Sequence, residues 1–223
     1  MGRAPRIDLG NYVYHVLNRA NARLPIFHND ADYKLFESVL EEVQQITEMR
    51  ILSYVIMPNH FHLILYPRSD GDLSKFMQRL TLTHTQRWHS AHNTVGQGHL
   101  YQGRYKSFIL KGDRYLFNVL RYVERNPVRA NLVSDGLLWK YGSLYRRYNG
   151  TKDEKKLLSP WLIPEPKDYL EILHKPLTND ELITVRNSAN KSTPYGNDSW
   201  VLDMIEEYGM QMTRRSRGRP KGT

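Results

Sequence analysis

Two short apolar runs separated by a proline restrict the possible folds of this chain most strongly. Residues 51–66 are rich in β-branched and aromatic types, and Met57-Pro58-Asn59 interrupts them. Strands favour these residue types, and a proline followed by asparagine favours a tight break. We therefore expect a strand, a tight break and a second strand.

His60 and His62 lie on the second of these strands. Alternate side chains of a strand share a face, so the two imidazoles point the same way, about 6.6 Å apart along the chain. Two imidazoles at that spacing can hold one divalent metal ion. Phe61 between them is expected to face the core, which leaves the histidines on the outer side of the sheet or in a groove beneath a helix. The alternative is a structural or incidental histidine pair.

The remaining periodicity predicts further strands and helices on either side of this pair. Strands are expected at residues 11–18 and 105–110, and helices after Asn29, after Asp70-Gly71, and from about Asp113 to Asn126. The order is then β-α-β-β-α-β-α. That order matches the ferredoxin-like split βαβ arrangement, an α+β fold with four antiparallel strands and helices on one face.

A change of composition near Asn149 divides the chain. Residues 1–148 are predicted to form the main domain. Residues 149–212 are predicted to be a polar linker and a small helical C-terminal region, with short helices at 168–174, 179–188 and 198–209. Residues 213–223 form a basic tail without apolar side chains other than proline, which we expect to be disordered when free.

The charge balance favours a polyanionic partner. The chain has 32 Lys and Arg against 23 Asp and Glu, a formal charge of +9, and nucleic acid is the expected partner through phosphate contacts. It has no cysteine, which excludes disulfides, thiolate catalysis and cysteine-based zinc fingers. The sequence shows neither a signal peptide nor an apolar stretch of about 20 residues, so we expect a soluble cytoplasmic protein, associated with the nucleoid and not with a membrane.

Tyr122 and Asn126 lie four residues apart in the third predicted helix and therefore share a face. A cation bound by the histidines and the amide oxygen of Asn126 would neutralise a phosphodiester, and this donor set suits Mg²⁺ or Mn²⁺. Tyr122 would be the nucleophile, although a phenol with a pKa of about 10 needs activation. Tyr115 competes for this role but has Val119, and no asparagine, four residues on. The alternative makes Tyr122 a core aromatic residue and Asn126 a helix end.

Four other histidines fit no clear ligand set, and we expect them at the surface or in contact with DNA. They are His84, His89, His92 and His99.

The chain resembles the REP-associated tyrosine transposases, domesticated relatives of the single-tyrosine HUH transposases of bacterial insertion sequences. The resemblance covers roughly residues 10–148. Four separated motifs carry it in the expected order, namely Tyr14–Arg19 (YHVLNR), Met57–Leu63 (MPNHFHL), Gln102–Lys106 (QGRYK) and Arg121–Ala130 (RYVERNPVRA).

The resemblance implies a role for each matching residue. His60 and His62 are implied as the metal-binding HUH pair, Phe61 as its hydrophobic member, Tyr122 as the nucleophile and Asn126 as a further metal ligand. The insertion-sequence branch typically has glutamine at the last position, so Asn126 is one methylene shorter. The implied reaction is transesterification on single-stranded DNA beside repetitive extragenic palindrome hairpins, through a 5′-phosphotyrosine that a 3′-hydroxyl can reverse or redirect.

Several cations are candidates for phosphate contacts. In the motifs these are Arg19, Arg104, Lys106 and Arg129, and in the tail they are Arg214, Arg215, Arg217 and Arg219. The tail contains Arg-Gly-Arg-Pro at 217–220, the core of an AT-hook that places arginines in narrow A·T minor grooves. Solvent-exposed charge and nonspecific phosphate binding are the alternatives.

Two functions remain open at this point. The first is a Mg²⁺- or Mn²⁺-dependent DNA nicking and joining enzyme, which acts as a monomer or a homodimer. The second is a noncatalytic module that binds hairpin DNA or RNA, because ferredoxin-like sheets also bind RNA through stacked aromatic residues.

Overall fold

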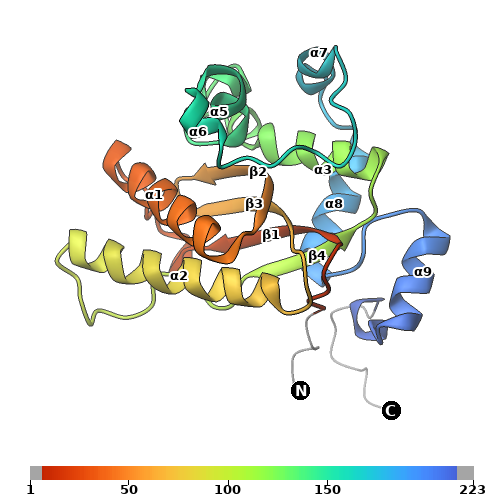
Figure 1. Ribbon diagram of the computed structural model, residues 1–223, viewed down its shortest axis with the longest axis horizontal. Helices are drawn as coiled ribbons and strands as arrows, with labels where there is room; N and C mark the ends of the chain where they lie inside the picture. Colours follow the sequence, from red (N-terminus) through yellow and green to blue (C-terminus); the bar gives the residue numbers. More distant parts are fainter. Residues whose placement is uncertain (1–6, 215–223) are drawn as a thin grey trace.

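A four-stranded antiparallel sheet lies at the centre of the protein (Figure 1). The computed structural model describes residues 7–214. The strands are β1 (Val13–Arg19), β2 (Arg50–Met57), β3 (His60–Tyr66) and β4 (Lys106–Leu110), in the spatial order β2-β3-β1-β4. With a helix after β1 and another after β3, this is the split βαβ arrangement. The predicted α+β fold is confirmed.

The tight break at Pro58 and Asn59 joins β2 to β3 directly. Met57 pairs with His60 across the turn, so only two residues connect the strands. A register shift between Ile51 and Ser53 places one extra residue in β2. Such a bulge redirects the side chains that follow it, and here Ser53 reaches a buried cluster described below.

Two long helices cover one face of the sheet (Figure 1). They are α1 (Asp30–Thr47) and α2 (Asp72–Ala91). The Asn29 side chain accepts hydrogen bonds from the amides of Ala31 and Asp32, which satisfies donors at the start of α1. Phe36, Val39 and Leu40 of α1 pack with Phe61 of β3 in this core.

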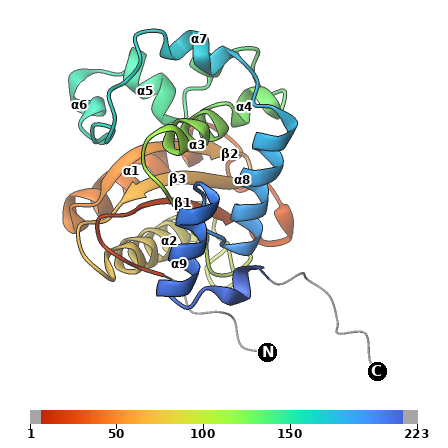
Figure 2. The same ribbon diagram turned by 90° about the vertical axis from the view of Figure 1, so that its right-hand side faces the viewer.

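The opposite face of the sheet is also covered, which corrects the expectation of helices on one face only (Figure 2). Helix α3 (Arg114–Glu124) and helix α8 (Asn179–Lys191) pack against it. The reason is that β2 is buried almost along its whole length, and a strand buried on both faces carries a continuous apolar run. Leu116, Val119 and Leu120 of α3 meet Phe108 and Ile64 there.

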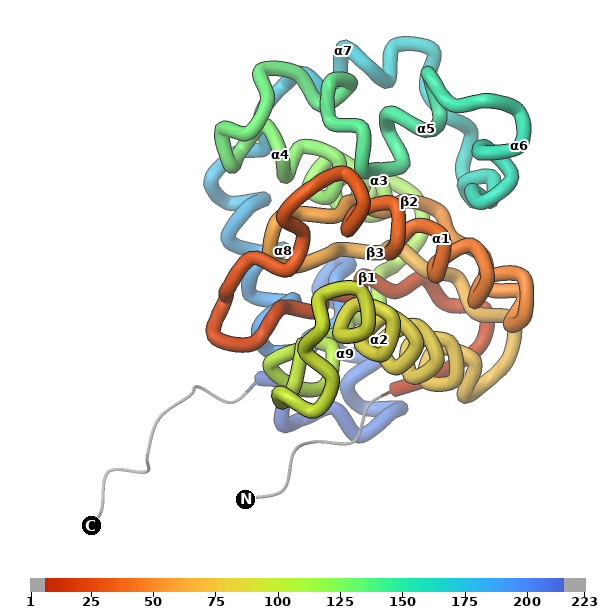
Figure 3. Tube along the Cα trace, turned by 90° about the vertical axis from the view of Figure 1, so that its left-hand side faces the viewer, coloured from red at the N-terminus to blue at the C-terminus, as the bar shows by residue number. Residues whose placement is uncertain are grey.

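The C-terminal segment packs against the sheet and α3. It contains α5 (Ser143–Asn149), α6 (Lys152–Lys155), α7 (Tyr169–His174), α8 and α9 (Asp198–Glu207), with η3 (Gln211–Arg214) at its end. Helices α5, α6 and α7 gather at the end of the molecule away from α2 (Figure 3). The Ser159 amide donates to the Ile51 carbonyl at 2.8 Å, so the segment predicted as a linker lies against β2. The division at residues 148 and 149 stays a prediction.

The remaining short elements connect these helices and strands. They are η1 (Asn21–Arg23), α4 (Asn126–Arg129) and η2 (Gly136–Leu138). None of the helices between residues 7 and 214 is both long enough and apolar enough to cross a bilayer. Arg214 closes η3 and is exposed, whereas the predicted tail contacts Arg215, Arg217 and Arg219 lie outside the described residues.

Candidate active site

His60 and His62 face α3, on the side of the sheet opposite to α1 and α2. Phe61 lies between them in the α1–α2 core, as the alternation of side chains predicted. The ring centroids of the two histidines are 5.1 Å apart. Since a bond from zinc to a histidine nitrogen is about 2.0–2.1 Å long and other divalent ions bind at similar range, two imidazoles at this separation can coordinate one ion.

Burial keeps both of these imidazoles neutral. Desolvation lowers the pKa of His60 to about 4, and the positive charges of Arg19 and Arg129 contribute to this shift. Desolvation also lowers the pKa of His62 well below its ordinary value, with smaller contributions from neighbouring His15 and His60. At neutral pH both rings therefore have an unprotonated nitrogen, as metal coordination requires.

One nitrogen of each ring is engaged by a neighbour. Nδ1 of His60 lies 2.7 Å from Oδ1 of Asn59, and Nδ1 of His62 lies 2.8 Å from Nε2 of His15. Among the described residues, no hydrogen bond occupies Nε2 of either His60 or His62. In metal-binding histidines, the ring nitrogen that does not bind the metal is usually hydrogen-bonded to a neighbour, as Nδ1 is in both of these residues. The pair therefore fits a divalent ion bound through the two Nε2 atoms.

Tyr122 lies beside the histidine pair within the same chain. Its ring centroid is 5.8 Å from that of His62 and 6.0 Å from that of His15, edge to face in both cases. The side chain comes from the last turn of α3, and Tyr122 is 7 % exposed. The competing Tyr115 instead accepts a hydrogen bond from Arg114 and packs against Tyr195. Of these two tyrosines, Tyr122 is the one that meets the histidines.

Asn126 lies just past the end of α3, where the helix is interrupted. The backbone at Arg125 leaves the helical conformation, and α4 restarts at Asn126 with Pro127 in its first turn. The side-chain nitrogen Nδ2 of Asn126 donates to the Tyr122 carbonyl at 3.2 Å, and Arg129 donates to it at 3.3 Å, so both satisfy an acceptor that the interrupted helix leaves open. Its Oδ1 accepts a hydrogen bond from Arg129.

The side-chain oxygen of Asn126, predicted as a further metal ligand, is therefore engaged by another partner. Arg129 holds Asn126 Oδ1, and its guanidinium carbon lies 4.4 Å from the Tyr122 ring centroid. Within residues 7–214, no group of three His, Cys, Asp or Glu side chains could hold a metal ion. The Nε2 atoms of the two imidazoles are free of hydrogen bonds within the described residues, whereas the side-chain oxygen of Asn126 is hydrogen-bonded to Arg129.

The predicted phosphate contacts differ in their distance from the site. Arg19 pairs with His60 across β1 and β3, and its Nε is buried without a hydrogen-bond partner. Arg19 and Arg129 both act electrostatically on His60, so both lie at the site. Lys106 begins β4 and donates to Asn190 of α8 at 3.2 Å, while Arg104 is exposed in the preceding loop.

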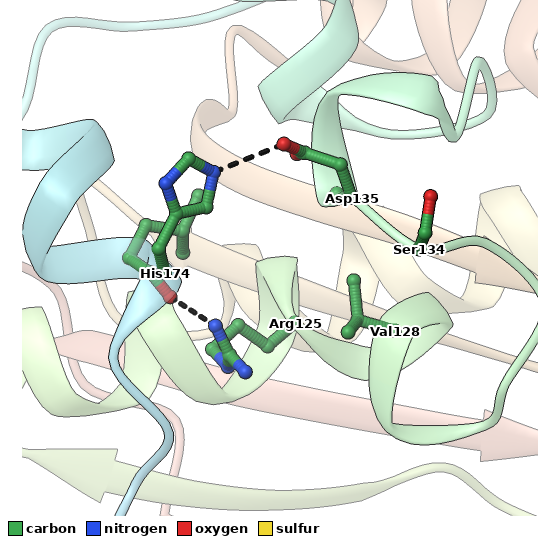
Figure 4. Close-up of a pocket in the computed structure, with 7 residues that line it drawn as sticks. Arg125, Val128, Ser134, Asp135 and His174 are labelled. Carbon is green, nitrogen blue, oxygen red and sulfur yellow. Dashed lines mark hydrogen bonds and ion pairs between the residues drawn. The ribbon is translucent and has the colours of Figure 1, made fainter.

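The helix that carries Tyr122 is tied to the C-terminal segment. Arg121 donates to the carbonyls of Lys175 and Pro176, and Arg125 donates to that of Leu173. Both arginines thus point away from the Tyr122 face, toward α7 and the start of α8, as helical geometry predicts. Arg125 lines a cavity of about 290 Å³, where His174 meets Asp135 (Figure 4).

Glu124 anchors the same end of α3 from the other side. Its buried carboxylate accepts hydrogen bonds from Ser53 at 3.0 Å, Ser143 at 3.0 Å and Tyr169 at 2.7 Å. These three hydroxyls come from β2, α5 and α7. Burial raises the pKa of Glu124, and the hydroxyl donors oppose that shift.

Two histidines occupy positions that the sequence did not indicate. His84 was expected at the surface, but it is 0 % exposed and lies 2.7 Å from the Tyr101 hydroxyl beneath α2, because position 84 continues the apolar stripe of that helix. His15 belongs to a recognised motif without an assigned role, yet it contacts His62 and Tyr122. Its strand position indicates the correct face, but only the pairing of β1 with β3 shows which side chains it meets.

Known proteins support the resemblance. The sequence model of the family described as "Transposase IS200 like" matches residues 9–126. No curated protein matches the chain. The structure is similar to that of a REP-associated tyrosine transposase bound to a REP hairpin, with a TM-score of 0.56, 18% identity, and coverage of 66% of this chain and 84% of that one.

Two further structures are less similar. A candidate transposase from Deinococcus radiodurans has a TM-score of 0.40 and 18% identity over 56% of this chain and 95% of its own. The tRNA(His) guanylyltransferase from Saccharomyces cerevisiae has a TM-score of 0.45 and 11% identity over 88% of this chain and 84% of its own. Both likenesses are too weak to indicate function. The family match spans more than half of the sequence, and the chain therefore belongs to the IS200-like transposase family.

Proposed function

We propose that this transposase is a metal-dependent single-stranded DNA endonuclease and strand transferase, with Tyr122 as its nucleophile. The observation that carries the proposal is the position of the Tyr122 ring, 5.8 Å from the ring of His62. A phenol and a pair of neutral imidazoles from distant parts of the sequence meet in one buried place. A metal-assisted tyrosine transesterification at a phosphodiester uses a phenol nucleophile beside a site for a cation.

The covalent step exchanges one ester for another. The Tyr122 oxygen forms a bond to phosphorus, and the bond between phosphorus and the 3′ oxygen breaks. The phenol loses one proton, and the departing 3′ oxygen takes one up as a hydroxyl. The product is a 5′-phosphotyrosine, which a 3′-hydroxyl can attack in the reverse direction without an external energy source.

The chain's own residues prepare this step. His60 and His62 would hold Mg²⁺ or Mn²⁺ through Nε2, with Asn126 as a further oxygen donor once Arg129 leaves it. The bound ion would act as a Lewis acid on the phosphate oxygens. Arg19 and Arg129 add positive charge beside His60, where a phosphodiester would approach.

We infer that the substrate is DNA that folds into hairpins of the repetitive extragenic palindrome type. The similarity in fold to a transposase bound to such a hairpin supports this substrate, as does the formal charge of +9. Arg104 and Lys106, near the start of β4, are candidate contacts to the DNA backbone outside the site.

The test is formation of a covalent protein–DNA adduct. The full chain is incubated with a 3′-labelled hairpin oligonucleotide and Mn²⁺, and the adduct, which keeps the 3′ part of the DNA, is detected as a denaturation-resistant shift. We expect Tyr122→Phe to abolish the adduct while hairpin binding survives. Tyr115→Phe is the matched control and should form adduct at the wild-type rate.

Variants of the two histidines separate the effect of the metal on catalysis from its effect on DNA binding. We expect His60→Ala and His62→Ala to bind the hairpin but to form little adduct at any Mn²⁺ concentration tested. An adduct that persists in Tyr122→Phe refutes the assigned nucleophile. Tight hairpin binding with no cleavage by the wild type in Mg²⁺ or Mn²⁺ identifies a noncatalytic binding protein instead.

A further inference from the structure

We propose that His15 is the positioning residue that orients His62 and fixes its tautomer for metal coordination. Its Nε2 lies 2.8 Å from Nδ1 of His62, and the two residues are 1 % and 2 % exposed. The inference rests on the proposed function, because it assigns a role to a neighbour of a proposed metal ligand.

Coordination through Nε2 of His62 fixes where the ring proton must be. Nε2 needs a free lone pair, so the proton of the neutral ring must sit on Nδ1 and be donated to an acceptor. The atom within reach is Nε2 of His15. His15 must then carry its own proton on Nδ1. The opposite arrangement puts a proton on Nε2 of His62 and closes that position to the metal.

The partner of His60 shows why His15 matters more than an ordinary acceptor. The Asn59 side-chain nitrogen donates to the Arg23 carbonyl at 2.8 Å, so Oδ1 of Asn59 is left to accept from His60. An amide oxygen can only accept, and it enforces one tautomer of His60. His15 can donate or accept, so the tautomer of His62 depends on that of His15.

The ring of His15 is itself held by aromatic neighbours. Its centroid lies 4.8 Å from that of Phe108 on β4 and 6.0 Å from that of Tyr122. His15 and His62 occupy adjacent strands, where diagonal neighbours on one face lie within reach of aromatic side chains. A substitution at His15 that keeps an aromatic ring is therefore expected to change the orientation and tautomer of His62 and to leave the strand pairing intact.

The experiment measures Mn²⁺ binding by the full chain without DNA, from the electron paramagnetic resonance signal of the free ion. His15→Phe keeps the ring and removes the acceptor, and we expect Mn²⁺ binding to weaken about 10–100-fold, as for other partners of metal-binding histidines. His15→Gln places an oxygen near the original Nε2 and should restore most of the affinity. His84→Phe changes a buried histidine on the opposite face of the sheet, and this variant should bind Mn²⁺ as the wild type does.

Adduct formation gives a second signature. In His15→Phe, the Mn²⁺ concentration for half-maximal adduct formation should rise by the same factor, whereas metal-free hairpin binding should stay unchanged. If His15 had a purely structural role, His15→Phe would weaken metal-free hairpin binding as well as the response to Mn²⁺. The thermal unfolding curve of each variant checks that it has folded.

A measurement on the wild type needs no substitution. Long-range ¹H–¹⁵N spectra of histidine-labelled protein report which nitrogen of His62 carries the proton, and we expect Nδ1. Protonation of Nε2 overturns the inference, as does wild-type Mn²⁺ affinity in His15→Phe. If the wild type binds no Mn²⁺, or if His60→Ala binds it equally well, the proposed function fails together with the role of His15. If the wild type binds Mn²⁺ through His60 but His15→Phe binds it equally well, only the role of His15 fails.

Discussion

The buried hydrogen bond between Tyr169 and Glu124 connects the C-terminal segment to the helix of the proposed nucleophile. The Tyr169 hydroxyl donates to Oε2 of Glu124 at 2.7 Å, and Glu124 follows Tyr122 by two residues in the sequence. The tyrosine is 1 % exposed and the glutamate 3 %. We expect loss of this bond to destabilise the protein and to loosen the last turn of α3.

The expected size follows from the chemistry of the pair. A hydrogen bond to a charged or partly charged buried group contributes about 1.5–3 kcal/mol, so Tyr169→Phe should lower the free energy of unfolding by that amount. Glu124→Gln should lower the free energy of unfolding by a similar amount, because the amide nitrogen of the glutamine cannot accept hydrogen bonds from the hydroxyls around it. Since both changes remove one shared bond, the double variant should cost about 1–2 kcal/mol less than the sum.

Urea unfolding followed by fluorescence measures these energies, and the adduct assay measures the consequence for Tyr122. We expect the rate of adduct formation to fall in Tyr169→Phe while the hairpin dissociation constant changes less than about twofold. Tyr148→Phe is the matched control, since Tyr148 donates to Glu165 at 2.6 Å on the surface and should cost no more than about 0.5 kcal/mol. Strict additivity of the two buried changes refutes the coupling, and an unaltered adduct rate refutes the link to Tyr122.

Three further predictions concern charge. Burial lowers the pKa of His84 to about 3, so the unfolded chain binds a proton below about pH 6.5 that the folded chain rejects, and stability is lost as pH falls from there toward 3. From about pH 6.5 to about pH 5 this loss is about 1.6 kcal/mol, and urea unfolding of His84→Leu should lack it; equal losses in both proteins contradict the assignment. Arg129→Met should raise the pKa of His60 above about 4, because a neighbouring positive charge is removed, and an unchanged NMR titration of His60 would count against their proximity. Deletion of residues 215–223, which leaves η3 intact, should reduce the salt dependence of DNA affinity by about 0.7–0.9 in slope for each phosphate that these residues neutralise, so an unaltered slope excludes them as a DNA-binding element.

Local patterns in the sequence predicted most of the fold. The strands and long helices were located to within a few residues for elements such as β1, expected at 11–18 and observed at Val13–Arg19. The helix expected from about Asp113 runs from Arg114 to Glu124. Side-chain periodicity and proline or glycine breaks are local properties, and they are sufficient to predict the order of strands and helices along the chain. The sequence predicts helices where α3 and α8 lie, but the expectation of helices on one face does not place them on the second face of the sheet, where the continuous apolar run of β2 is also buried.

The proposed site divides in the same way. Residue spacing alone indicated that His60 and His62 share a face, that Phe61 opposes them, and that Tyr122 precedes Asn126 by about one turn. The contacts between distant residues needed the folded chain. His15 meets His62 across 47 residues of sequence, Arg129 holds the Asn126 oxygen, and Glu124 meets Ser53 across 71 residues. Strand pairing and helix packing determine these contacts. Residue spacing does not predict them, because the periodicity of one segment does not show which other segment it packs against.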